Sequence, residues 1–206
     1  MNLPRRSFLL ALPLMLLTGT HRVGAQDAEP SRVVEGQSFA ARVVVADAAL
    51  LLNGTGVRAV AWFKGYAAGL YLSARSLSPS QVLAQKGPKR LQLRLLQDVP
   101  SAEFVRALRK GIERNAPEAE RAALAPRVER FSAQIAAAGK VRKGDVVDLD
   151  LDPALGLLFS LNGTLRGPPI EGADFYVALL RAFIGEHPYD ERLKAGLLGD
   201  PGAGPR

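Results

Sequence analysis

The residues best suited to chemistry lie in one predicted β-hairpin, residues 53–72, which reads NGTGVRAVAWFKGYAAGLYL. It places one arginine, Arg58, and two tyrosines, Tyr66 and Tyr71, among apolar residues. Burying a guanidinium among such neighbours is costly unless an anion compensates its charge. Because the hairpin contains no acidic residue, Arg58 must either pair with a distant carboxylate, such as that of Asp98, or bind an anionic ligand.

Strand pairing decides which tyrosine accompanies Arg58. The glycines of residues 54–56 predict a turn that opens the hairpin, and Lys64-Gly65 predicts the turn between its strands. A simple two-residue turn there would set Tyr71 opposite Arg58, whereas a bulge or a longer turn would set Tyr66 there. We predict Tyr66 as the companion and keep Tyr71 as the alternative.

The N-terminal residues have the pattern of an export signal. Arg5 and Arg6 precede an apolar run at 8–17, which is too short to span a bilayer and ends near small residues before Gln26. We therefore expect a cleaved signal over 1–25 and a periplasmic or otherwise exported protein, with a twin-arginine and an ordinary secretory signal both fitting. Its loss removes arginines but no acid, which lowers the formal net charge from +7 to about +4.

Composition excludes several classes of site. The chain has no cysteine, and His187 is the only histidine after the signal, so thiolate chemistry, a histidine relay and a zinc centre are not expected. No phosphate-binding glycine pattern precedes a predicted helix. We predict no cofactor, no metal, no nucleic-acid partner and no integral membrane segment in the mature chain, and the oligomeric state stays open.

Two charged patterns are interpreted as solvated surfaces. Arginines at 106–114 are interleaved with glutamates, which is typical of an exposed helix face. Asp148, Asp150 and Asp152 alternate with leucines, but Pro153 stands where a calcium-binding loop needs glycine. These aspartates therefore predict a solvated strand face.

The order of the predicted elements indicates an α+β fold with an antiparallel sheet covered on one face by helices. Ser101 is the predicted N-cap of the first long helix, and a bend is expected at Pro126 of the second. The Asn162-Gly163 pair predicts a tight hairpin, and Asp190 predicts the cap of a last short helix. The expected strands are 42–46, 50–52, 57–63, 66–73, 90–97, 157–161 and 164–167, and further helices are expected at 78–84 and 172–184.

Several motifs in this order resemble a chalcone isomerase-like domain: NGTGVR, GLYL, KGD at 143–145, the NG hairpin, GADF at 172–175 and IGEHP. The resemblance covers 38–199, so 26–37 is expected to be a polar lead and 200–206 a disordered tail. It implies a chalcone isomerase fold, an open-faced β-sandwich in which a helical layer covers a large antiparallel sheet, with a cleft between them.

The resemblance also implies roles for residues. In true chalcone isomerases, the arginine matching Arg58 holds a substrate phenolate, while a threonine and a tyrosine, here Tyr66 and Ser101, position a water. In the fatty-acid-binding branch, an arginine and a tyrosine similar to Arg58 and Tyr66 bind the ligand carboxylate. Tyr176 lies where the family lines its pocket.

Ser101 in place of a tyrosine favours binding of a fatty acid or similar amphipathic or aromatic anion over catalysis. An isomerase or intramolecular lyase that acts on a phenolic or enone substrate, with Arg58 stabilising an oxyanion, is the alternative. Apolar hairpin residues suit an acyl chain. The predicted ligand-binding residues are Arg58, Tyr66, Tyr71, Ser101 and Tyr176, and the apolar hairpin residues are Trp62, Phe63 and Leu70.

Overall fold

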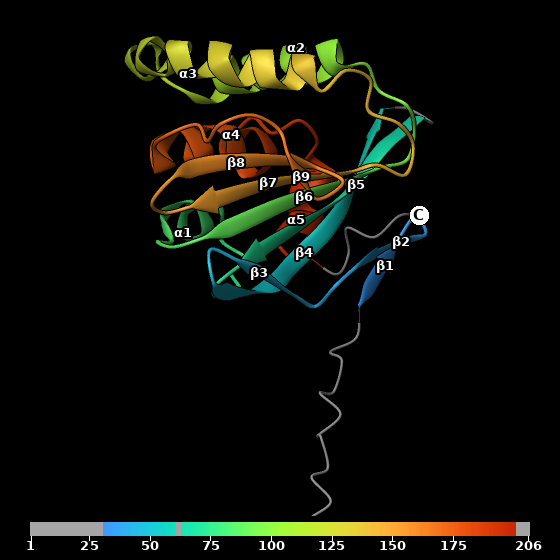
Figure 1. Ribbon diagram of the computed structural model, residues 1–206. Helices are drawn as coiled ribbons and strands as arrows, with labels where there is room; N and C mark the ends of the chain where they lie inside the picture. The colour runs from blue at the N-terminus through green and yellow to red at the C-terminus, as the bar shows by residue number, and fades with distance from the viewer. Residues whose placement is uncertain (1–30, 61–62, 201–206) are drawn as a thin grey trace, which may run out of the picture.

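The computed structural model describes residues 31–60 and 63–200, without the side chains of residues 60 and 63. Within this part of the chain, a seven-stranded antiparallel sheet has the order β3-β4-β5-β6-β7-β8-β9 (Figure 1), and β1 and β2 pair separately. The predicted export signal and residues 201–206 of the predicted tail lie outside the described residues. The strands are β1 (Arg32–Val34), β2 (Gln37–Phe39), β3 (Arg42–Val45), β4 (Ala48–Val60), β5 (Phe63–Leu72), β6 (Lys89–Leu95), β7 (Val146–Asp152), β8 (Gly156–Leu161) and β9 (Thr164–Leu165).

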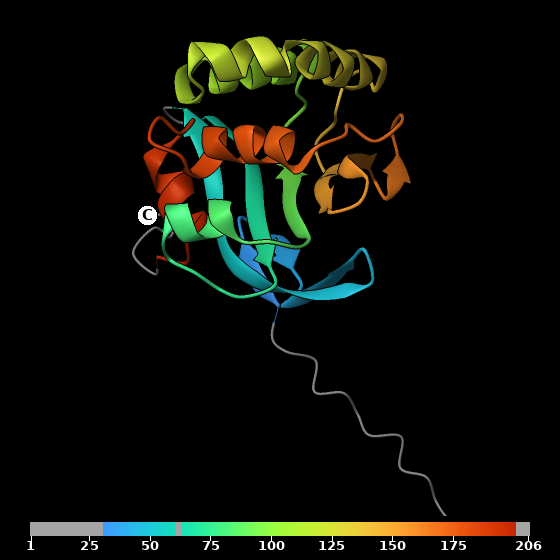
Figure 2. The ribbon, with the colours of Figure 1, turned by 90° about the vertical axis from the view of Figure 1, so that its left-hand side faces the viewer.

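The long helices form two layers over one face of the sheet. Helix α4 lies next to the strands, and the antiparallel pair α2 and α3 lies outside it (Figures 1 and 2). None of the helices in residues 31–60 and 63–200 combines the length and apolar character that crossing a membrane requires. The helices are α1 (Pro79–Ala84), α2 (Ser101–Asn115), α3 (Glu118–Ala137), α4 (Ala173–Ile184) and α5 (Glu191–Leu197).

The alternation of strand residues divides the core between the two faces of the sheet. Leu93 of β6 and Leu149 of β7 belong to the main cluster beneath the helices. Phe39 and Tyr71 belong to a second cluster on the opposite face, which β1 and β2 help to form. Part of the predicted polar lead, 26–37, forms β1 and the start of β2, and Val34 within it is buried.

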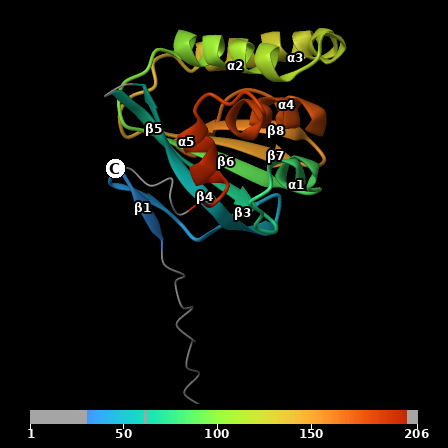
Figure 3. The ribbon, with the colours of Figure 1, turned by 180° about the vertical axis from the view of Figure 1, so that it is seen from behind.

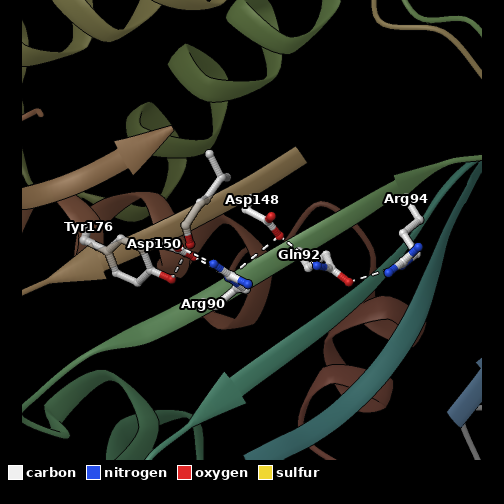
Figure 4. Close-up of polar contacts among 7 residues, drawn as sticks. Arg90, Gln92, Arg94, Asp148, Asp150 and Tyr176 are labelled. Carbon is white, nitrogen blue, oxygen red and sulfur yellow. Dashed lines mark hydrogen bonds and ion pairs between the residues drawn. The ribbon is translucent and has the colours of Figure 1, made fainter. Parts of the chain in front are cut away.

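The predicted solvated strand face of β7 is also buried. Arg90 donates to both carboxylate oxygens of Asp150, at 2.6 and 2.5 Å, and Gln92 donates to Asp148 at 2.8 Å (Figure 4). Both aspartates are only 8% exposed. Burial raises the pKa of Asp150, and the hydrogen bonds from Arg90 oppose that shift. Because Arg90 of β6 neutralises the charge of Asp150 on β7, this second face of the sheet can be buried.

Local signals predicted most elements but misplaced two turns. Residues 54–56 lie inside the continuous strand β4, and Lys64-Gly65 lies inside β5, so neither forms the predicted turn. Residues 61–62, between the two strands, lie outside the described residues. The Asn162-Gly163 turn is confirmed, with φ angles of 53° and 75°. Ser101 is the first residue of α2 rather than its cap, and Pro126 lies inside the single helix α3.

Candidate functional site

A bulge in the β4–β5 hairpin sets Arg58 beside Tyr66. These residues are paired across the two strands, and the register shifts between Arg58 and Ala59. Tyr71 is paired with Leu52 instead and lies in the second core cluster. The extra residue of the bulge thus places Tyr66, and not Tyr71, opposite the arginine.

Arg58 has an internal partner, but it is not Asp98. Its Nη1 donates to Asp190 Oδ2 at 3.2 Å and to the carbonyl of Ala59 at 2.9 Å. Asp98 instead pairs with Lys140 at 2.8 Å. Among the described residues, the hydrogen bonds of Arg58 use Nη1 alone, so Nε and Nη2 are available to a ligand.

The other oxygen of Asp190 caps α5. Its Oδ1 accepts from the backbone N–H groups of Arg192 and Leu193, at 2.9 and 3.0 Å. The predicted capping role of Asp190 is confirmed, and the same side chain also contacts Arg58. One carboxylate therefore connects the start of α5 to the hairpin.

Glycines allow α5 to approach β4 closely enough for this contact (Figure 3). A Cβ added to Gly54 would lie 2.6 Å from the Gly199 nitrogen and 2.7 Å from the Leu197 carbonyl oxygen. Asn53 anchors the same approach, since its Nδ2 donates to the Leu197 carbonyl at 2.8 Å. The NGTG sequence is therefore a docking surface for α5 rather than the predicted turn.

A cavity of about 310 Å³ lies between the sheet and the helices, and Arg58 and Tyr66 line it. Its polar lining residues include Glu103 and Tyr189 as well. Arg58 is 28% exposed and Glu103 is exposed, whereas the apolar lining residues of β6, β7 and β8 are buried, so the polar groups lie at its mouth. The apolar lining is Leu93, Val99, Phe104, Ala107, Leu108, Phe131, Ile135, Ala138, Val141, Val147, Leu149, Phe159, Leu179 and Phe183.

Two neutral phenols accompany Arg58 in the cavity lining. Burial raises the pKa of Tyr66, and Arg58 only partly opposes that shift. Burial likewise raises the pKa of Tyr189, whose hydroxyl donates to the Ala107 carbonyl at 2.8 Å. No side-chain hydrogen bond of Tyr66 occurs among the described residues. The Tyr66 hydroxyl thus joins Arg58 Nε and Nη2 as a donor group available to a ligand.

The other predicted ligand-binding residues lie away from the cavity. Tyr71 is fully buried on the opposite face of the sheet, and burial raises its pKa to about 12. Tyr176 is fully buried in the main core, and its hydroxyl donates to the Leu149 carbonyl at 3.1 Å (Figure 4). Ser101 does not line the cavity, and Leu70 is a core residue outside its lining. Trp62 and the side chain of Phe63 lie outside the part of the chain that the structure describes.

Arg58, Tyr66, Tyr189 and Asp190 form a polar cluster at the mouth of the cavity, and sequence reasoning missed two of its residues. Tyr189 was not considered, and Asp190 was interpreted as a helix cap alone. The sequence HPYD at 187–190 offers a weak signal, because its proline and aspartate are typical turn residues. Only the fold brings Asp190 next to Arg58, from a position 132 residues away in the chain.

The described residues contain no group of three or more histidine, cysteine or carboxylate side chains arranged to hold a metal ion. The cluster consists of one guanidinium, one carboxylate paired with it, and two phenols. Such an arrangement can hydrogen-bond an oxygen-containing headgroup while the apolar cavity takes a hydrocarbon group.

Comparison with known proteins agrees with this architecture. The family model described as chalcone isomerase-like matches residues 31–199. No curated protein sequence matches significantly. The crystal structure of the Arabidopsis thaliana fatty-acid binding protein AtFAP1 is similar, with a TM-score of 0.64 and 18% identity, over 84% of this chain and 98% of that one. The predicted α+β fold, a large antiparallel sheet with a helical layer, is confirmed.

Proposed function

The chain belongs to the chalcone isomerase-like family, and from this premise we propose that its cavity binds a fatty acid or a similar amphipathic carboxylate. Arg58 and Tyr66 contact the headgroup. One observation carries the proposal: available donor groups of an arginine and a phenol lie at the mouth of a cavity that is otherwise almost entirely apolar. The similar AtFAP1 structure is that of a fatty-acid binding protein, which supports this class of ligand.

The headgroup chemistry fits an oxygen anion. A guanidinium offers planar N–H donors that match a carboxylate, and hydrogen bonds with an ionised partner are stronger than neutral ones. Tyr66 keeps its proton because burial raises its pKa, so its hydroxyl can donate a hydrogen bond to an anionic headgroup instead of repelling it as a phenolate. Together these groups offset part of the cost of removing a carboxylate from water.

The cavity size points to a short or medium acyl chain. At about 310 Å³ it lies at the lower end of the roughly 300–1,000 Å³ range of ligand pockets. Leu93, Phe131 and Phe159 contribute buried apolar surface deeper inside. We therefore use decanoate as the test ligand for the proposed function.

Binding without catalysis is the better interpretation of this site. Ser101, at the position where the related isomerases have a tyrosine, does not line the cavity. Tyr66 stands where those enzymes have a threonine, and it is paired with Arg58 across the two strands. The groups that would activate an enone are thus not assembled here in the way that the isomerase reaction requires.

The test is to denature the purified protein and identify released small molecules by mass spectrometry. We expect acyl acids from wild type, much less from Arg58→Ala, and unchanged loading in Arg130→Ala, which removes an exposed arginine on α3. Melting curves establish that each variant is folded. An empty wild-type cavity that also fails to take up added decanoate, or equal loading in Arg58→Ala, would refute the proposal, and chalcone turnover that depends on Arg58 would establish the isomerase instead.

We also propose that the protein acts after export, since the arginine pair and apolar run at 5–17 support a signal. Cell fractionation and N-terminal sequencing of the protein expressed with its own leader test this. A processed form starting near Gln26 in the periplasmic fraction is the expected result. Full-length protein confined to the cytoplasm contradicts it.

A further inference from the structure

Asp190 already binds one nitrogen of Arg58, the residue proposed to contact the headgroup. Its carboxylate is 14% exposed and lies 3.2 Å from Arg58 Nη1, so an arriving anion meets a guanidinium whose charge is balanced. Other charged groups near the mouth have partners of their own. Glu103 pairs with Arg106 at 3.2 Å, and Lys64 pairs with Glu35 at 2.7 Å.

The structure also holds Asp190 in place. Its Oδ1 accepts two backbone N–H groups of α5, so rotation away from Arg58 would break the helix cap. Helix α5 in turn packs on β4 through Gly54 and Gly56, where backbone atoms of the two elements nearly touch. A ligand carboxylate therefore has to share Arg58 with a fixed carboxylate.

Sharing one cation between two anions weakens anion binding. Tyr66 and Tyr189 remain neutral, so they donate hydrogen bonds without adding positive charge. Repulsion between carboxylates about 6 Å apart at the edge of a cavity, with allowance for solvent screening, lowers anion affinity by about tenfold. An uncharged headgroup with the same carbonyl oxygen avoids that repulsion and keeps the hydrogen bonds.

We propose that Asp190 is a specificity-determining residue, which makes the headgroup site electrically neutral and lets it accept uncharged carbonyl amphiphiles as readily as carboxylates. This inference rests on the proposed function and deepens it. Arg58 then acts chiefly as an oriented hydrogen-bond donor, with Asp190 fixing its direction. The ligand class widens from fatty acids to neutral amphiphiles of similar length.

The experiment compares decanoate with decanamide by calorimetric titration at about pH 8, where the acid is ionised. In Asp190→Ser, which keeps a capping hydroxyl, and in Asp190→Asn, decanoate affinity should rise about tenfold while decanamide affinity changes less than about threefold. Asp174→Asn is the matched control, since it removes another aspartate near a helix N-terminus, paired with Arg127 at 2.6 Å and outside the cavity lining.

Equal changes for both ligands, or a weaker affinity for decanoate alone, would overturn the inference, because they would show that Asp190 only supports the fold or the direction of Arg58. A wild-type protein that prefers decanoate strongly over decanamide would overturn it as well. If wild type binds neither ligand, the proposed function is wrong, and this inference, which rests on it, is wrong as well. The two failures are therefore distinguishable.

Discussion

Replacing Gly54 by alanine tests whether close packing of α5 on β4 holds the headgroup site together. The new Cβ would meet the Gly196 carbonyl oxygen and would lie 2.6 Å from the Gly199 nitrogen and 2.7 Å from the Leu197 carbonyl oxygen. These are backbone atoms, so no side-chain rotation can relieve the overlap. Helix α5 must shift outward, and Asp190 at its start must shift with it.

The size of the expected loss in stability follows from the type of contact. Overpacking a well-packed interior costs about 1–3 kcal/mol, and a methyl group wedged between two backbones belongs at the upper end of that range. We therefore expect the free energy of unfolding to fall by about 3 kcal/mol. For a domain of this size, that loss lowers the melting temperature by about 6–12 °C.

Thermal and urea unfolding of Gly54→Ala beside Gly65→Ala is the assay. Gly65 lies in the same hairpin, but its added Cβ would lie 3.8 Å from the Arg58 carbonyl oxygen, the nearest atom beyond its two chain neighbours. The control should leave stability unchanged or raise it by up to about 1 kcal/mol. Equal melting temperatures for Gly54→Ala and wild type would refute the close-packing argument.

Three further predictions concern single side chains. Tyr71→Phe removes a buried hydroxyl that has no hydrogen-bond partner among the described residues, so urea unfolding should show a gain of about 1 kcal/mol, and a loss would reveal a missed partner. Tyr66→Phe removes an available headgroup donor, so titration should show decanoate affinity reduced about tenfold, and an unchanged affinity would exclude this contact. The hydrogen bonds from Arg127 hold the pKa of Asp174 below its ordinary value of 3.8, so the pair stabilises the fold above that pH and loses this contribution as the pH falls through the lowered pKa. Urea midpoints of Asp174→Asn should therefore fall below those of wild type at neutral pH and converge with them in acid; a constant difference would contradict the pKa shift.

Regular elements could be predicted because their signals are local. Phe104, Leu108 and Ile112 repeat at helical spacing within α2, and Asn162-Gly163 predicted the turn before β9. The antiparallel sheet was predicted from the order of strands and helices along the chain. These signals depend on neighbours in the chain, so one sequence is enough to recognise them.

The site could be predicted only in part, because its remaining features depend on distant contacts. Arg58 stood out as a charge among apolar residues, but its partner Asp190 lies on an element at the other end of the chain. Tyr66 and Tyr71 could not be separated without the bulge after Arg58. The alternation of aspartates and leucines in β7 predicted a solvated strand face. In the fold, Arg90 and Gln92 of the neighbouring strand β6 lie beside Asp150 and Asp148 and bury them.

The central claim is that Arg58 and Tyr66 bind the headgroup of an amphipathic acid whose chain enters the cavity. A crystal structure of the protein with decanoate tests it most directly. We predict a headgroup oxygen within hydrogen-bond distance of Arg58 and of the Tyr66 hydroxyl, with the chain against Leu93 and Phe131. Decanoate bound with its headgroup elsewhere, or a cavity still empty at saturating ligand, would contradict the claim.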